Sequence, residues 1–158
     1  MKAVIQRVIN ASVSADGAVI GRIESGLLVY LGVAHNDSEA DADWLAGKTA
    51  FLRIFNDSEG KMNLSLKDIV SNGVTAGVLI VSQFTLLADA RKGRRPSWNG
   101  AAPAEKAKYL YEYFIDVVKK HNLVCESGEF QAHMNVTYTN DGPVTIILDS
   151  AGLNESVS

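Results

Sequence analysis

The first third of the chain alternates between apolar and polar residues in a way that predicts three strands. Residues 3–14 mix β-branched and polar residues roughly in alternation, as a half-buried strand does. Asp16-Gly17 is a hairpin signal, so a second strand is expected over Ala18–Ile23. Ser25-Gly26 then turns the chain into residues 27–33, a nearly unbroken apolar run that is typical of a central strand covered on both faces.

Two later segments follow the period of a helix. In the first, Ser38 and Asp41 resemble a capping box, and the helix predicted after them has an inward stripe of Trp44, Leu45, Lys48, Phe51 and Leu52. The second begins after Pro103 and covers residues 104–121, where apolar side chains recur every three to four positions: Tyr109, Leu110, Tyr113, Phe114 and Val117. These are the two main helices that the sequence predicts.

The remaining segments complete a mixed pattern. Residues 53–55 suit a short strand, and the pattern of residues 64–70 is ambiguous. Residues 77–87 indicate a buried strand that turns polar at Ser82-Gln83, and two final strands are expected around residues 130–139 and 144–148. We therefore predict one α+β domain over residues 1–149, with a largely antiparallel, barrel-like sheet, followed by a polar tail over residues 150–158.

Composition supports a folded domain and indicates in which cellular compartment it works. Of the 158 residues, 47% are hydrophobic and 21% charged, so the chain can bury a core. The longest apolar run, residues 26–34, is too short to span a bilayer, and polar Gln6 and Arg7 interrupt the N-terminal apolar stretch before a signal-peptide core forms. The single cysteine, Cys125, excludes an internal disulfide and fits a reducing compartment. We expect a cytoplasmic protein without a membrane segment.

Positive charge is concentrated in one short stretch. Residues 89–98 hold Arg91, Lys92, Arg94 and Arg95 against one acidic residue, Asp89, which is a local charge of +3 in a chain of net charge −3. Such a basic loop can bind phosphates locally although the rest of the protein is acidic. A solvated surface loop would have the same composition, and charge alone leaves both interpretations open.

Metal and cofactor chemistry find no support in the motifs. The three histidines, His35, His121 and His133, are scattered, and none has a second histidine or cysteine at ligand spacing. The phosphate-loop and dinucleotide fingerprints are absent, as is the Gly-x-Ser-x-Gly elbow of common esterases. We therefore expect neither a metal nor a cofactor.

Ser82-Gln83-Phe84-Thr85-Leu86 is the first segment with chemical potential. It places hydroxyls, an amide and backbone N–H groups at the end of an apolar strand, where they can hold a carbonyl oxygen as charge builds on it during ester cleavage. The alternative is that Ser82 and Thr85 only end the strand by bonding to the backbone. No histidine or lysine near Thr85 in the sequence offers itself as a base for a threonine nucleophile.

Asn140-Asp141-Gly142-Pro143-Val144-Thr145 is the second such segment. Asn-Asp-Gly predicts a tight turn, but the proline removes a backbone donor and restricts the residue before it. The Gly142-Pro143 peptide can be cis or trans, and cis has a base rate of about 5–6% among X-Pro bonds in folded proteins. By itself this segment indicates a turn and not a site.

Together the two segments resemble the signature motifs of D-aminoacyl-tRNA deacylases, and the similarity extends over residues 1–149. Further stretches agree in order along the chain: Gln6-Arg7-Val8, Ala11-Ser12-Val13, Gly26-Leu27-Leu28-Val29, Leu31-Gly32-Val33, Arg53-Ile54-Phe55, Gly60-Lys61-Met62-Asn63 and Arg95-Pro96-Ser97. Trp98 stands where the family has phenylalanine, which keeps an aromatic side chain at that position.

The resemblance implies an ester hydrolase that acts on D-aminoacyl-tRNA, and also on glycyl-tRNA(Ala). It further implies a homodimer in which the Gly142-Pro143 turn, with a cis peptide, enters the partner subunit's active site. There its carbonyl oxygens leave room for a hydrogen on the substrate's α-carbon but not for an L side chain, and Arg7 supports the turn. Ser82, Gln83, Phe84 and Thr85 form the catalytic segment, and Arg91, Lys92, Arg94 and Arg95 are candidates for tRNA binding.

The resemblance leaves the mechanism and two other functions open. Either Thr85 is the nucleophile, or the 2′-hydroxyl of the terminal adenosine and water do the chemistry while backbone N–H groups hold the oxyanion. The absence of a base near Thr85 favours the second account. One alternative function is a relative of the same fold that removes L-alanine from the wrong tRNA, in which the Gly-Pro peptide is trans. The other is a module that binds nucleic acid without catalysis, through residues 91–95 and Trp98.

Overall fold

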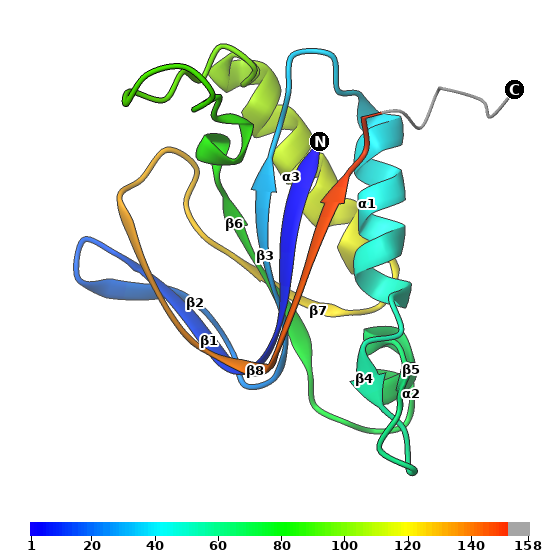
Figure 1. Cartoon of the computed structure of the whole chain (residues 1–158). Coiled ribbons are helices and arrows are strands. Elements are labelled where there is room, and N and C mark those ends of the chain that lie inside the picture. Colours follow the sequence, from blue (N-terminus) through cyan, green and yellow to red (C-terminus); the bar gives the residue numbers. More distant parts are fainter. Residues whose placement is uncertain (152–158) are drawn as a thin grey trace, which may run out of the picture.

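A curved mixed sheet with helices on one side makes up the protein (Figure 1). The computed structural model describes residues 1–151. The main sheet contains six strands, β1 (Lys2–Ala15), β2 (Ala18–Ile23), β3 (Gly26–Gly32), β6 (Gly77–Ser82), β7 (Val124–Ser127) and β8 (Met134–Asp149). A small second sheet pairs β4 (Phe55–Asn56) with β5 (Met62–Leu64). The helices are α1 (Glu39–Phe51), α2 (Leu66–Ser71), the 3₁₀ helix η1 (Phe84–Leu87) and α3 (Ala104–Lys120).

Strand β1 organises the sheet. It pairs antiparallel with β2, β3 and β8, and these pairings account for the predicted antiparallel character of the fold. The β3–β6 and β6–β7 pairs are parallel, because α1 and α2 lie between the first two strands along the chain and α3 lies between the second two. Parallel neighbours need such crossover segments. The predicted α+β domain with a barrel-like sheet is confirmed.

The two faces of the sheet are covered differently. Helices α1 and α3 cover one face, where Leu45 and Phe114 pack with strand residues such as Ile5 and Val29. On the other face, β1, β2 and β8 curl over the sheet and enclose a second cluster around Leu28. This curl makes the sheet barrel-like, and it leaves part of the second face uncovered.

Local signals predicted the ends of α1 and α3 well, but not the inward face of α1. Of the predicted stripe, Lys48 and Phe51 are exposed. Small side chains lie on the buried face instead, where α1 packs against α3 and the sheet: besides Leu45, these are Ala42, Ala46, Thr49 and Ala50. Ser38 and Asp41 form the predicted capping box at the start of α1, and α3 ends one residue before its predicted end. Residues 64–70, which the sequence left open, contain α2; its N-cap Ser65 accepts a hydrogen bond from the N–H of Asp68 at 3.1 Å. Capping pairs lie three residues apart, so the chain itself brings them together.

Two strand predictions were wrong. The strand expected over residues 77–87 ends at Ser82, and η1 follows it. The two final strands, expected to be separate and joined by a turn, form one strand, β8, which pairs with β1 along its length. In both cases a pairing strand that is distant in sequence, β3 for β6 and β1 for β8, determines how far the strand extends.

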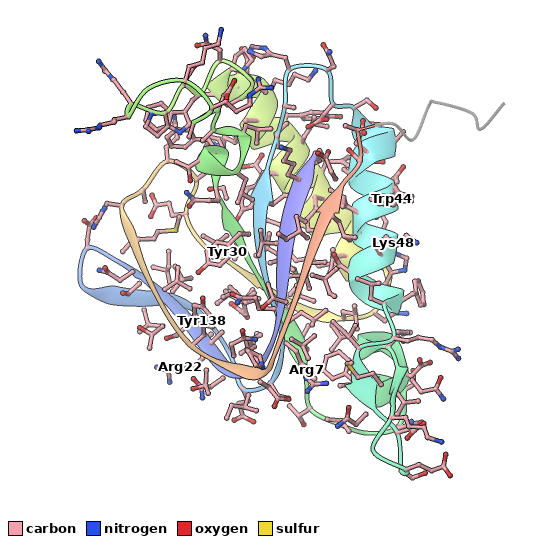
Figure 2. The ribbon with its side chains drawn as sticks, in the orientation of Figure 1. Arg7, Arg22, Tyr30, Trp44, Lys48 and Tyr138 are labelled. Carbon is pink, nitrogen blue, oxygen red and sulfur yellow. The ribbon has the colours of Figure 1, made fainter. Side chains whose placement is uncertain are left out.

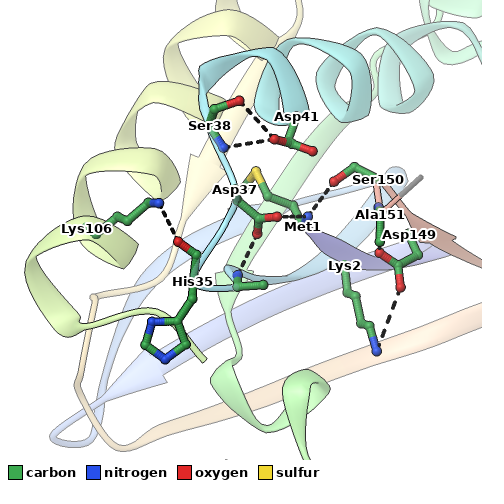
Figure 3. A network of polar contacts seen from close by, with 11 residues as sticks. Met1, Lys2, His35, Asp37, Ser38, Asp41, Lys106, Asp149, Ser150 and Ala151 are labelled. Atoms are coloured by element: carbon green, nitrogen blue, oxygen red, sulfur yellow. Dashed lines mark hydrogen bonds and ion pairs between the residues drawn. The ribbon is translucent and has the colours of Figure 1, made fainter. Parts of the chain in front are cut away.

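The two ends of the described chain meet in a buried polar network (Figure 3). The Met1 ammonium lies 2.6 Å from Oδ1 of Asp37 and also donates to the Ser150 hydroxyl. The other carboxylate oxygen of Asp37 accepts the N–H of Ala34 at 2.5 Å. Ser150, the first residue of the predicted tail, is buried, and the rest of that tail from residue 152 lies outside the described residues. Among residues 1–151, no helix is long and apolar enough to cross a membrane.

Candidate active site

The Ser82-Gln83-Phe84-Thr85-Leu86 segment turns sharply away from the sheet at the end of β6. Ser82 is paired with Leu31 on β3, and the N–H of Gln83 donates to the Leu31 carbonyl at 2.8 Å. Phe84 and Thr85 then begin η1, and both are exposed. The Gln83 side-chain amide donates to the Thr85 hydroxyl. Because the first N–H groups of a 3₁₀ turn have no partner within it, this segment presents backbone donors beside two hydroxyls and an amide.

Gly32 allows η1 to lie this close to the sheet. A Cβ atom at Gly32 would lie 2.5 Å from Cδ2 of Leu87, 2.9 Å from the carbonyl oxygen of Gln83 and 3.1 Å from Cβ of Leu86. The Gln83 oxygen is a backbone atom, and a Cβ atom does not come within 3.0 Å of one, so any side chain at position 32 would displace the segment. The sequence pattern did not single out Gly32, because only the folded chain brings it against η1.

A cavity of about 560 Å³ opens beside this segment. Its wall is mostly apolar and includes Phe84, Phe130 and several alanines, while Ser82, Gln83, Gln131 and His133 supply polar groups. Tyr30 also lines it and lies next to Tyr138 (Figure 2); burial and this second tyrosine raise the pKa of Tyr30 to about 12, so its hydroxyl keeps its proton. A concave, largely apolar site with a few polar groups suits a small organic moiety such as a nucleoside.

Residues 141–144 bulge out of β8. On either side of the bulge, Val8 pairs with Asn140 and Gln6 with Thr145, so four residues of β8 face the single residue Arg7 of β1. The Gly142-Pro143 peptide is cis, the isomer that the resemblance implied. Gly142 has φ +112°, a value that L side chains rarely adopt. Gly142 and Pro143 are both exposed and project from an edge strand.

Arg7 and Asn140 hold this bulge from two sides. The Arg7 side chain is buried; its Nη1 donates to the Ile54 carbonyl at 2.6 Å, and its Nε forms an ion pair with Asp141 at 2.8 Å whose geometry is not that of a hydrogen bond. The Asn140 amide donates to the carbonyl oxygens of Arg7 (2.9 Å) and Val144 (3.0 Å). Arg7 therefore lies beside the turn, the position that the resemblance implied. The sequence did not lead us to predict that Asn140 holds the bulge, although asparagine before a turn is a signal for such side-chain-to-backbone bonds.

The structure separates the two motifs within one chain. Leu148, Ala3, Leu31 and Ser82 form one row across β8, β1, β3 and β6. Pro143 precedes Leu148 by five residues, so with about 3.3 Å per residue and about 4.8 Å per strand it lies roughly 20 Å from Ser82. Figure 1 shows the bend of β8 and η1 at opposite ends of the sheet. One chain alone does not bring the motifs together.

The basic loop is a separate feature next to η1. Backbone hydrogen bonds between Asp89 and Ser97, of 2.7 and 2.9 Å, close its base. Asp89 holds Arg91 through a bidentate pair of 2.9 and 2.6 Å, and these bonds lower the pKa of the Asp89 carboxyl. Lys92, Arg94 and Arg95 are exposed. Trp98, at the base of this loop, packs against Phe84.

No group of three or more histidine, cysteine or acidic side chains with metal-binding geometry occurs among residues 1–151.

Similarity to known proteins identifies the family of this chain. The model of the D-Tyr-tRNA(Tyr) deacylase family matches residues 4–149. The chain belongs to the D-Tyr-tRNA(Tyr) deacylase family.

Its relatives in this family are similar over nearly their full length. A protein of Thermosipho melanesiensis named D-aminoacyl-tRNA deacylase is 55% identical over 95% of this chain and 97% of that protein. One of Thermotoga petrophila with the same name is 53% identical over 97% and 99%.

Two solved structures share the fold. A c-Myc DNA unwinding element binding protein has a TM-score of 0.85 at 38% identity and covers 95% of this chain and 99% of its own. A probable eukaryotic D-amino acid tRNA deacylase has a TM-score of 0.78 at 16% identity over 93% and 97%, which shows the fold alone.

Proposed function

We propose that this protein hydrolyses the ester bond of D-aminoacyl-tRNA and releases the free D-amino acid and tRNA. The observation that carries the proposal is the Ser82-Gln83-Phe84-Thr85 segment at the mouth of a nucleoside-sized cavity, in a member of this family. Relatives more than half identical are named for this activity. A reducing cytoplasm, in keeping with the lone Cys125, is the location that we propose.

The site suits chemistry by positioning rather than by a protein nucleophile. In our proposal a water oxygen attacks the ester carbonyl carbon, the bond to the 3′ oxygen breaks, and a proton passes to that oxygen. The 2′-hydroxyl of the same ribose assists, and the backbone N–H groups of Phe84 and Thr85 hold the developing oxyanion. The Thr85 hydroxyl has the Gln83 amide beside it, and an amide is no base.

The cavity is our proposed site for the terminal adenosine of the tRNA. Its apolar wall suits the faces of a purine, and Ser82, Gln83 and the neutral Tyr30 hydroxyl suit its polar edges. With adenosine in this cavity, the ester lies beside the N–H groups that begin η1.

We further propose that Gly142-Pro143 selects chirality, and that it acts on the active site of a second subunit. A backbone obstacle at the α-carbon rejects L side chains without having to recognise any particular D side chain. The bulge suits this role because it is exposed, lacks a side chain at Gly142, and is anchored by Arg7 and Asn140. Such a filter leaves glycine room, so we also propose activity on glycyl-tRNA(Ala).

The uncovered sheet face supports a homodimer. Ile147, Val4, Tyr30 and Val81 form a row across four strands, on the face opposite the helices. Ile147, in the edge strand β8, is 74% exposed. A long edge strand with apolar side chains is usually covered by another chain. Within one chain the Gly142-Pro143 turn lies roughly 20 Å from Ser82, as estimated from strand spacing, so association through this face would instead bring the turn to the site of the second subunit.

The deciding experiment compares D-tyrosyl-tRNA with L-tyrosyl-tRNA, in the presence of EDTA. Our proposal predicts rapid loss of the D ester and a nearly unchanged half-life of the L ester. Equal rates for both enantiomers would contradict the selection mechanism, and preferential cleavage of L-alanyl-tRNA would favour the L-alanine-editing alternative. No cleavage of any ester, combined with binding of bare nucleic acid, would favour the binding module.

A further inference from the structure

Phe84 and Trp98 form an exposed aromatic pair at the mouth of the cavity. Their ring centroids are 5.9 Å apart with planes inclined by 59°. Phe84 is 60% exposed and Trp98 39%, although both could bury much apolar area. Neighbouring rings that stay exposed in this way are typical of a surface that contacts something else.

The cavity and the basic loop both adjoin this pair. Phe84 also lines the cavity, whereas Trp98 directly follows Ser97, whose backbone bonds with Asp89 close the basic loop. Cavity, aromatic pair and exposed cations therefore follow one another across the surface. Because Asp89 already holds Arg91, the cations free to meet an outside anion are Lys92, Arg94 and Arg95.

We propose that the Phe84–Trp98 pair stacks an unpaired base of the RNA, next to the terminal nucleotide that occupies the cavity. The basic loop then neutralises the phosphates of the following nucleotides. This inference rests on the proposed function, since it takes the cavity as the place of the terminal adenosine. Aromatic side chains beside a cationic groove bind single strands without strong sequence preference. Bases within a duplex are stacked on one another and do not present their faces, so the partner is the single-stranded 3′ end.

Tryptophan fluorescence tests the stacking directly. The chain has two tryptophans, and Trp44 lies on α1, away from the loop (Figure 2). In a Trp44→Phe background the signal comes from Trp98 alone. Uncharged tRNA and a short single-stranded RNA ending in adenosine should quench it, whereas duplex RNA and tRNA trimmed of its unpaired 3′ end should not. Equal quenching by duplex RNA, or no quenching by RNA that binds, overturns the proposal.

Affinity for uncharged tRNA supplies a second readout that needs no catalysis. Trp98→Ala should weaken binding by about tenfold, and Trp98→Phe should retain most of it because the ring is kept. Lys61→Ala, an exposed cation on the β4–β5 hairpin, is the control and should leave affinity unchanged. If Trp98→Ala binds tRNA like the parent protein, the stacking proposal is wrong. If the parent protein binds RNA and its fluorescence is quenched but it cleaves no ester, the stacking proposal stands and the proposed function fails.

Discussion

The Nε atom of Arg7 lies 2.8 Å from Oδ2 of Asp141. This ion pair joins the middle of β1 to the bulge that contains Gly142 and Pro143, residues more than 130 positions away in the chain. Arg7 Nη1 meanwhile donates to the Ile54 carbonyl, and a Cβ atom at Gly142 would lie 3.2 Å from Arg7 Nη2. With only 8% of its surface exposed, Arg7 is a rigid support for the bulge.

Replacing Arg7 by lysine should loosen the bulge. Lysine keeps the charge but not the planar group that reaches Ile54 and Asp141 together, so we expect the variant to lose stability by about 1–3 kcal/mol. We also expect a lower rate on D-tyrosyl-tRNA and a smaller preference for D over L, measured as a ratio of kcat/KM values. Lys2→Met removes an exposed ion pair on the same strand and is the control. An unchanged preference in Arg7→Lys would mean that the bulge does not depend on this support.

Gly32→Ala should displace η1, which belongs to the proposed catalytic segment. The added methyl group would lie 2.9 Å from the Gln83 carbonyl oxygen, so η1 must move. We expect a loss of about 1–3 kcal/mol in stability, as for overpacked sites, and a fall in kcat of at least about tenfold. Gly47→Ala is the matched control, because beyond its chain neighbours and its own helix backbone the added methyl group at this position meets nothing within 4 Å. Full activity in Gly32→Ala would show that the position of η1 is unimportant for the reaction.

Thr85→Ala should retain substantial activity if the RNA and backbone do the chemistry. The same account predicts poor cleavage of a substrate that ends in 2′-deoxyadenosine. Single-turnover rates measured with both substrates separate the two mechanisms. The reverse result, an inactive Thr85→Ala and a good deoxy substrate, would identify Thr85 as the nucleophile.

Ile147→Asp should dissociate the proposed homodimer and remove activity with it. An aspartate in the apolar row of β8, β1 and β3 would have to lose its hydration at the interface. Light scattering gives the oligomeric state, and circular dichroism checks that the fold is kept. Val74→Asp replaces another exposed apolar residue, outside this face, and should remain dimeric. A monomeric parent protein with full activity would rule out the shared active site.

Alanine at Arg91, Lys92, Arg94 and Arg95 together should raise KM for D-tyrosyl-tRNA. Fewer counterions would be released on binding, so KM should also depend less steeply on salt concentration. Because these side chains are exposed and lie outside the core, thermal stability should change little. Unchanged KM and salt dependence would leave the loop as solvated surface.

The sequence by itself determined those features that depend on near neighbours. Three examples are the capping pair Ser38 and Asp41, the Asp16-Gly17 hairpin and the amphipathic stripe of α3. Within each feature the interacting residues are only a few positions apart, so the chain alone brings them together. The motifs at residues 82–86 and 140–145 are likewise defined by residue order alone, and that order is enough to indicate the family.

Only the tertiary structure decided how those motifs are placed. The 140–145 segment is a bulge in one edge strand because Val8 and Gln6 of β1 pair on either side of it, and pairing across such separations leaves no local signal in the sequence. Gly32 matters because η1 folds back onto it, and Trp98 meets Phe84 because Asp89 and Ser97 close the loop between them. The roughly 20 Å between the motifs, estimated from strand spacing, also follows from sheet order, which is set by packing the whole chain at once.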